Sequence, residues 1–217
     1  MDVAVVDAAI VEEALTSPLS PGLELIETFI PPNESEQLFV RLVAEQPWPD
    51  NHYQVFGRQF TLPRLQTWHA DPGIVYCYSN NLLVSRPWNA LLSSLRRRVE
   101  EATGCRFNAV LVNYYRDGSD YVGWHCDDDA EMGEAPVIVS LSLGAARDFS
   151  FRRKGNHGEV GRLVLSAGSL LRMPPQFQRD WEHSVLPVGH SGGRINLTFR
   201  YLFPPERATI LGAQSPQ

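Results

Sequence analysis

The C-terminal half of this chain is a series of short β segments divided by turn residues, and this pattern constrains the fold more than any other feature. Gly, Pro, Asp and Asn separate the segments. Many short strands at this spacing are typical of a sandwich or barrel rather than of a parallel sheet with crossover helices. Strands are expected at 107–115, 137–143, 148–152, 163–165, 169–173, 183–186 and 194–203.

Two helices are expected before this region, with short aromatic-rich strands between them at 52–79. The first helix runs from Asn33 to about Gln46 with acids in its first turn, and the second runs from Pro87 to Gly104. The expected inward residues, at helical spacing, are Phe39, Leu42, Val43, Leu91, Leu92, Leu95 and Val99. The predicted fold class is α+β, mainly β, with two N-terminal helices packed on a double-sheet barrel.

The length and composition fit one ordinary domain: 217 residues, of which 43% are hydrophobic and 20% charged. The formal net charge is -6, but it is unevenly distributed. Residues 1–50 hold ten acids and one base, whereas residues 51–217 hold 18 bases and 15 acids, a net charge of +3. The acidic total therefore does not argue against a nucleic-acid partner.

The three cysteines make an odd count without zinc-type spacing, so a disulfide framework is not expected. No apolar run reaches the roughly 18 residues needed to span a bilayer, and the first residues carry acids where a signal peptide needs bases. The expected location is cytoplasmic, the cytosol if the source is bacterial, with a nuclear location left open. No membrane partner is expected.

Two His-x-Asp tripeptides occur, at 69–71 and 125–127. The first leads into Pro-Gly and is interpreted as a turn whose Asp caps its own backbone. The second follows an expected strand and a loop. In an extended segment, positions i and i+2 point to the same side, so His125 and Asp127 can converge on one metal ion. Cys126 then points away and is interpreted as a small packing residue.

His183, at the start of a late strand, is the candidate third ligand. Two histidines and one carboxylate on strands of a β barrel form the facial arrangement of non-haem Fe(II) oxygenases, which leaves positions open for a cosubstrate and dioxygen. Taken alone, His183 would be interpreted as a buried, hydrogen-bonded histidine. The remaining histidines are expected in surface loops: His52, His157 and His190.

The segment 194–200 alternates polar and apolar residues, which predicts a strand with two different faces. The polar face carries Arg194, Asn196, Thr198 and Arg200. Burying two guanidiniums is costly unless a dianion lies beside them, and a dicarboxylate such as 2-oxoglutarate fits that need. The alternative is that this face is the solvated side of an edge strand.

At these residues the sequence resembles the AlkB family of Fe(II)- and 2-oxoglutarate-dependent oxygenases, closest to the branch with the animal nuclear DNA-repair homologues. The motifs are Asn-Tyr-Tyr-Arg-Asp-Gly at 113–118, Trp-His-Cys-Asp-Asp-Asp at 124–129, Val-Ser-Leu-Ser-Leu-Gly at 139–144, Trp-Glu-His at 181–183 and Arg-Ile-Asn-Leu-Thr-Phe-Arg at 194–200. The resemblance extends from about Gln54 to Pro204. One departure is Tyr114, which stands where the family commonly has a basic residue.

The resemblance implies a double-stranded β-helix, or jelly-roll, core at 107–203 within one dioxygenase domain at 23–205. Residues 1–22 would be a loosely ordered acidic extension and 206–217 a tail. Iron would be held by His125, Asp127 and His183. By similarity, 2-oxoglutarate would be held by Asn113, Tyr115, Arg194, Asn196, Thr198 and Arg200. Arg200 would pair with its distal carboxylate.

The resemblance also implies a nucleotide-recognition hairpin and lid at 52–86. Phe56 would fill the gap left by a flipped base, and the lid and Asp128 would contact that base. The implied substrate-binding residues are Phe56, Gly57, Arg58, Tyr76, Cys77, Tyr78 and Asp128. Without the resemblance, Phe56 would be a strand-end residue and the two lid tyrosines half-buried strand residues. The basic runs at 96–98 and 152–154 are expected to be solvated, with phosphate contacts as the alternative.

The implied function is oxidative demethylation of N-alkylated DNA bases, such as 1-methyladenine and 3-methylcytosine. Fe(II) would be the cofactor, 2-oxoglutarate and O2 the cosubstrates, and formaldehyde and succinate the products. The expected partner is alkylated DNA, with RNA left open, and the protein is expected to be a monomer. The alternatives are the same chemistry on RNA or a protein side chain, and a non-catalytic jelly-roll binding module.

Overall fold

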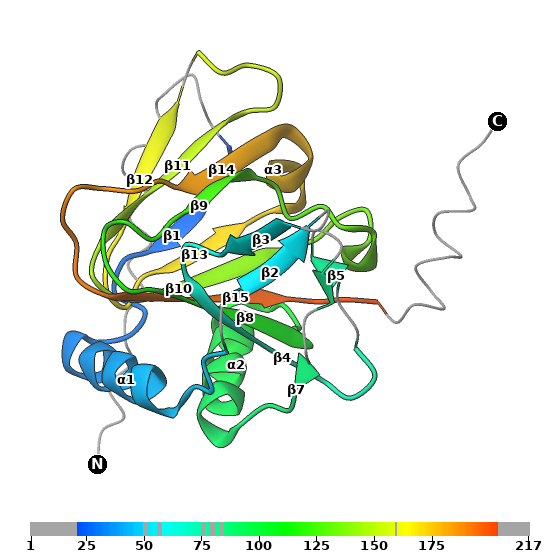
Figure 1. Ribbon diagram of the computed structural model, residues 1–217. Coiled ribbons are helices and arrows are strands. Elements are labelled where there is room, and N and C mark those ends of the chain that lie inside the picture. The colour runs from blue at the N-terminus through cyan, green and yellow to red at the C-terminus, as the bar shows by residue number, and fades with distance from the viewer. Residues whose placement is uncertain are drawn as a thin grey trace.

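The computed structural model describes residues 21–49, 52–55, 58–74, 77–78, 81–82, 85–158 and 160–203. A seven-stranded major sheet forms its centre (Figure 1). In spatial order its strands are β1 (Glu24–Ile26), β13 (Leu170–Met173), β10 (Ile138–Gly144), β15 (Arg194–Arg200), β8 (Ala109–Tyr115), β4 (Leu65–Ala70) and β7 (Ser85–Arg86). All neighbours pair antiparallel except β4 and β7, which are parallel.

A four-stranded minor sheet covers one face of the major sheet, at the top of Figure 1. Its strands are β12 (Gly161–Leu165), β11 (Arg147–Arg153), β14 (Trp181–Val185) and β9 (Val122–His125). Apolar residues of both sheets share one buried cluster, to which Phe149 and Phe151 of β11 and Leu171 and Met173 of β13 contribute. Two facing antiparallel sheets confirm the predicted class of fold.

Two helices cover the other face of the major sheet: α1 (Pro32–Glu45) and α2 (Ala90–Thr103), at the bottom of Figure 1. Their buried residues join a second cluster with the outward residues of β10 and β15. The predicted start of α2 at Pro87 is wrong. The Asn89 side chain accepts a hydrogen bond from the Leu92 amide, so the helix begins at Ala90, and it ends at the left-handed Gly104 as expected.

Several short elements were not predicted from the sequence. They are β1, a 3-10 turn (Ala130–Met132) and a third helix, α3 (Pro175–Asp180). Outside the two main sheets, β2 (His52–Val55) pairs with β3 (Arg58–Thr61), and β5 (Cys77–Tyr78) pairs with β6 (Asn81–Leu82). No helix in the described ranges has the length and apolar composition of a membrane span.

β15 lies in the middle of the major sheet, between β10 and β8, and all its residues are buried. Ile195, Leu197 and Phe199 pack toward the helices. The polar residues of β15 alternate with these and point to the space between the sheets. The alternative of a solvated edge strand is therefore wrong, and the polar face is an interior one.

The segment 69–71 is no metal site in the structure. His69 is buried on β4, with Nδ1 2.9 Å from the Pro87 carbonyl oxygen and Nε2 3.0 Å from Gln46 Oε1. A turn does follow, with the Ile74 amide bonded to the Asp71 carbonyl. The Asp71 carboxylate does not cap it, however, because it accepts a 2.7 Å hydrogen bond from Arg96.

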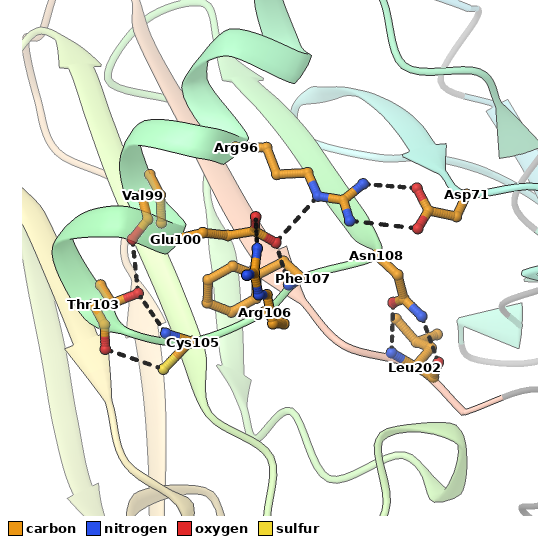
Figure 2. Close-up of polar contacts among 10 residues, drawn as sticks. All are labelled: Asp71, Arg96, Val99, Glu100, Thr103, Cys105, Arg106, Phe107, Asn108 and Leu202. Atoms are coloured by element: carbon orange, nitrogen blue, oxygen red, sulfur yellow. Dashed lines mark hydrogen bonds and ion pairs between the residues drawn. The ribbon is translucent and has the colours of Figure 1, made fainter.

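Carboxylates also engage the arginines that were expected to be solvated on α2 (Figure 2). Arg96 bonds both Asp71 and Glu100, and Arg98 pairs with Glu34 of α1. Glu100 further accepts from the Phe107 amide at 2.9 Å and from Arg106 at 3.2 Å, which fixes the chain where it leaves the helix for β8. These two arginines are therefore occupied by structural ion pairs rather than free for phosphate.

Replacement of Glu100 by Ala should lower the free energy of unfolding by about 1–3 kcal/mol, because the Phe107 amide and two guanidiniums lose their acceptor. Urea unfolding measures this loss. Glu101→Ala, at an exposed neighbouring position, is the matched control and should change stability by no more than about 0.5 kcal/mol. Equal effects of the two variants would show that Glu100 has no special role.

Candidate active site

Three potential metal ligands meet between the sheets, at the edge of the minor sheet. His125 ends β9, Asp127 follows two residues later, and His183 is the register partner of His125 on β14. The two imidazole rings lie 4.2 Å apart, and one ligand atom from each of the three residues lies within 4.8 Å of the others. Within the described ranges, no other group of three His, Cys, Asp or Glu residues meets this criterion.

The histidines are presented in forms that suit metal binding. His125 Nδ1 lies 2.9 Å from the Gly123 carbonyl oxygen, and since a carbonyl only accepts, Nδ1 donates this hydrogen bond and Nε2 is the nitrogen left to face a metal. His183 is buried against Phe149 and Phe177. Burial, helped by the neighbouring His125, lowers the pKa of His183 to about 3, so its ring is neutral at pH 7.

Asp127 is a buried carboxylate held in its charged form. Burial alone would raise its pKa, but the charge of Arg200 and its hydrogen bond outweigh burial, and the pKa of Asp127 lies below its ordinary value. Arg200 Nη2 donates to Asp127 Oδ1 at 2.7 Å, and Gln178 Oε1 accepts from the Asp127 amide at 2.9 Å. The carboxylate is therefore oriented by a strand of the major sheet, and its backbone is held by α3.

A cavity between the sheets opens beside the triad, and every residue predicted to hold 2-oxoglutarate lines it. These residues are Asn113, Tyr115, Arg194, Asn196, Thr198 and Arg200. The lining also contains a third arginine, Arg64, but only one carboxylate, that of Asp127. An interior with this surplus of guanidiniums suits an anionic ligand.

The polar residues of β15 differ in what they already bind. Asn196 donates to Ser140 Oγ at 2.5 Å and Thr198 donates to Asn196 Oδ1 at 2.8 Å. Arg200 is bonded to Asp127 at one end of the strand. At the other end, Arg194 donates from Nη2 to Ser142 Oγ at 2.9 Å, while its Nε and Nη1 are buried without a hydrogen-bond partner. The distal-carboxylate role expected for Arg200 stays a prediction, and Arg194 is a second candidate for it because its guanidinium bonds a hydroxyl rather than a carboxylate.

Arg64 is a cavity residue that the sequence reasoning missed. Its side chain donates from Nε to Asn113 Oδ1 at 3.0 Å and from Nη1 to the Tyr121 carbonyl at 3.2 Å. The amide oxygen of Asn113 is thus engaged, which leaves its Nδ2 to donate elsewhere. An arginine in a short turn before a strand carries no sequence signal of burial, so no pattern marked it.

The predicted substrate residues are only partly described. Phe56, Gly57 and Tyr76 lie outside the described residues, Arg58 begins β3, and Cys77 and Tyr78 form β5. The structure therefore leaves their predicted roles untested.

Asp128 is half exposed beside the triad and accepts hydrogen bonds from Lys154 Nζ at 2.9 Å and Cys126 Sγ at 3.1 Å. Cys126 is outside the metal-ligand group, as expected, but it makes a polar contact rather than only packing. Near them, Arg152 lies over the Trp124 ring at 4.1 Å and pairs with Glu182. Part of the basic run at 152–154 is therefore held by neighbouring side chains.

Tyr114, the residue that departs from the family pattern, lies on the opposite face of β8 from the cavity. Its ring contacts Phe39 of α1 at 6.3 Å and Trp48 at 5.4 Å between centroids. An aromatic ring here packs α1 onto the sheet, and this departure from the family pattern lies outside the cavity lining.

Comparison with known proteins agrees with this geometry. Residues 22–200 match the 2OG-Fe(II) oxygenase superfamily. DNA oxidative demethylase ALKBH2 of Mus musculus is 44% identical over 163 residues, which are 71% of this chain and 68% of that protein. Alpha-ketoglutarate-dependent dioxygenase alkB homolog 3 of Homo sapiens is 35% identical over 189 residues, 82% of this chain and 65% of that protein.

Solved structures show the same fold at low sequence identity. The structure of OsALKBH1 superposes with a TM-score of 0.62 at 17% identity, over 85% of this chain and 99% of that one. A prolyl hydroxylase from Trichoplax adhaerens gives a TM-score of 0.59 at 14% identity, over 91% and 89% of the two chains. The chain belongs to the 2OG-Fe(II) oxygenase superfamily and, within it, to the AlkB family, on the branch of the ALKBH2 and ALKBH3 enzymes.

Proposed function

We propose that this protein is a DNA oxidative demethylase that removes alkyl groups from base nitrogens, with Fe(II) as its metal and 2-oxoglutarate and O2 as cosubstrates. The observation that carries the proposal is a preformed His-Asp-His group beside a buried cavity rich in arginine. The names of the ALKBH2 relatives support DNA as the substrate.

In this proposal His125, Asp127 and His183 bind the iron. The donor set fits Fe(II), since two imidazoles and one carboxylate would leave room for a bidentate cosubstrate and for dioxygen. When bound, the iron supplies the oxidising chemistry that hydroxylates the alkyl group. Arg200 keeps the Asp127 carboxylate charged and oriented, and Gln178 fixes its backbone.

The same proposal places 2-oxoglutarate with its distal carboxylate at Arg194. The guanidinium of Arg194 has two nitrogens without hydrogen-bond partners, and Ser142 holds its third nitrogen in place. A carboxylate can accept from a guanidinium in a bidentate manner, which restores the hydrogen bonds that burial removes. Asn113 Nδ2, oriented by Arg64, would donate to the cosubstrate nearer the metal.

The substrates proposed are duplex DNA bases such as 1-methyladenine and 3-methylcytosine. Alkylation blocks the Watson–Crick edge, so such a base is poorly paired and its extrusion costs less. These bases carry a positive charge, and Asp128 offers a carboxylate next to the metal ligands. Burial raises the pKa of this carboxyl, but the hydrogen bonds from Lys154 and Cys126 outweigh burial and hold the pKa below its ordinary value. The hydroxylated methyl group would leave as formaldehyde, with succinate as the second product.

RNA and protein side chains are the competing substrates, and a non-catalytic jelly-roll module is the remaining alternative. We propose a monomer in the cytoplasm, or in the nucleus if the source is eukaryotic.

His125→Ala should reduce formaldehyde release from a 1-methyladenine oligonucleotide, with Fe(II) and 2-oxoglutarate supplied, by at least about 100-fold, because a metal ligand is lost. His157→Ala, in an exposed loop, is the matched histidine control and should keep full activity. Circular dichroism would verify that both variants are folded. Undiminished turnover by His125→Ala would refute the metal assignment, and absence of turnover in the parent would refute the demethylase activity.

The neutral state of His183 predicts a pH dependence of the metal-free protein. Unfolded, this histidine takes up a proton near pH 6.5; folded, it does so only near 3. The unfolded state therefore binds more protons in this window, and the free energy of unfolding falls as pH drops below 6.5. His183→Gln should reduce that slope by up to about 1.4 kcal/mol per pH unit in urea unfolding. Parallel pH profiles of parent and variant would contradict a neutral buried His183.

Phe56 distinguishes a duplex enzyme from one that acts on single strands. If it fills the gap left by a flipped base, Phe56→Ala should lower formaldehyde release from methylated duplex DNA by about 10- to 100-fold and leave single-stranded DNA and RNA substrates nearly unaffected. Activities on matched single- and double-stranded oligonucleotides provide the measurement. Equal losses on all substrates would argue against the wedge role and for a structural one.

A further inference from the structure

A second buried guanidinium lies near the cavity without lining it. Arg147, the first residue of β11, is only 3% exposed. Its guanidinium carbon lies 5.9 Å from the centre of the Tyr115 ring, and that of Arg194 lies 5.2 Å from the same ring. Tyr115 is therefore flanked by two buried cations.

The hydrogen-bond partners of Arg147 are all neutral. Its Nη1 donates to the Asp117 carbonyl at 3.2 Å, and its Nη2 donates to the carbonyls of Asp120 and Leu186 at 3.1 and 2.6 Å. Carbonyl dipoles accept from Nη1 and Nη2, whereas Nε is buried without a hydrogen-bond partner, and no carboxylate compensates the charge. No ion pair of Arg147 or Arg194 occurs among residues described by the structure.

The acidic side chains of the loop that Arg147 contacts are engaged elsewhere. The Asp120 carboxylate accepts from the backbone amide, Nε and Nη2 of Arg116, each at 2.8 Å. The Asp117 carboxylate accepts from the amide and hydroxyl of Ser119. The loop thus turns its carbonyls toward Arg147 and its carboxylates away, so the positive charge at this end of the cavity is not neutralised by the loop.

The charges of Arg147 and Arg194 also interact with each other. Burial lowers the pKa of Arg194, interactions with Tyr115 raise it, and the charge of Arg147 lowers it. Two cations held close together inside a protein repel one another, and the repulsion is relieved when an anion binds beside them. The two buried guanidiniums beside Tyr115 therefore suit a ligand whose far end is anionic.

We propose that Arg147 is a positioning residue for the cosubstrate: its charge, acting through Arg194 and Tyr115, selects 2-oxo acids that carry a second carboxylate. This inference rests on the proposed function, because it assumes that 2-oxoglutarate occupies the cavity with its distal end at Arg194. Arg147 does not contact the cosubstrate itself. Its carbonyl bonds also hold the loop at 117–120 and the end of β14, so charge and structure must be separated by experiment.

Matched substitutions at Arg147 separate the effect of its charge from that of its structural contacts. Arg147→Lys keeps the charge but loses the planar fork, whereas Arg147→Gln keeps a hydrogen-bond donor without the charge, and Arg147→Met provides a second neutral variant if the Gln variant does not fold. Arg194→Met is the positive control. Isothermal titration calorimetry on the full chain loaded with Mn(II) would measure the affinity for 2-oxoglutarate and for 2-oxopentanoate, which has a methyl group in place of the distal carboxylate.

The neutral Arg147 variants should weaken 2-oxoglutarate binding by about 10-fold, and Arg147→Lys by no more than about threefold. The affinity for 2-oxopentanoate should stay within about twofold in all of them. Unchanged 2-oxoglutarate affinity in the neutral variants would overturn the inference, and so would equal weakening of both ligands or an Arg147→Lys loss as large as the neutral ones. If the parent binds no 2-oxoglutarate, the proposed cosubstrate fails, and the Arg147 inference with it.

Discussion

The ion pair between Arg200 and Asp127 is the interaction on which the site depends. Arg200 belongs to β15 of the major sheet and Asp127 follows β9 of the minor sheet, so the 2.7 Å contact joins the two layers where the metal ligands meet. Both side chains are almost completely buried, and either charge alone would be costly there. The pair keeps the carboxylate ionised, and an ionised carboxylate is what a metal requires.

The charge inside the cavity therefore differs between the two ends of β15. The charge of Arg200 is neutralised by Asp127, whereas Arg194 at the opposite end of β15 has no carboxylate partner among the described residues. The guanidinium of Arg147 lies near the same Tyr115 ring as that of Arg194. A cosubstrate with a chelating end and an anionic end would match this gradient, because each end finds an opposite charge. If neutral side chains stood in place of these arginines, the interior would be an ordinary sandwich core with no charge to bind an anionic ligand.

The metal triad and the polar face of β15 could be predicted from the sequence because both follow from the period of a strand. His125 and Asp127 are two residues apart, and the polar residues 194, 196, 198 and 200 repeat at the same period. The outlines of the main helices followed from helical spacing. The six-residue α3 could not, since one short turn between prolines carries too little periodicity.

Burial of single arginines was the feature that the sequence reasoning could not reach. Arg64 and Arg147 are held by groups distant in the sequence: backbone carbonyls of loops for both, and the Asn113 side chain of β8 for Arg64. Conversely, Arg96 looked like a solvated helix residue and proved to bond Asp71 from the end of another strand. Such pairings depend on tertiary neighbours, and the local pattern does not encode them.

The most direct measurement is a crystal structure of the protein with Mn(II) and 2-oxoglutarate, recorded with the anomalous signal of manganese. The account predicts one anomalous peak bounded by His125, Asp127 and His183, and a distal carboxylate within hydrogen-bonding distance of Arg194. A peak away from these three residues, or a cosubstrate whose distal carboxylate reaches Arg200 in place of Arg194, would contradict it.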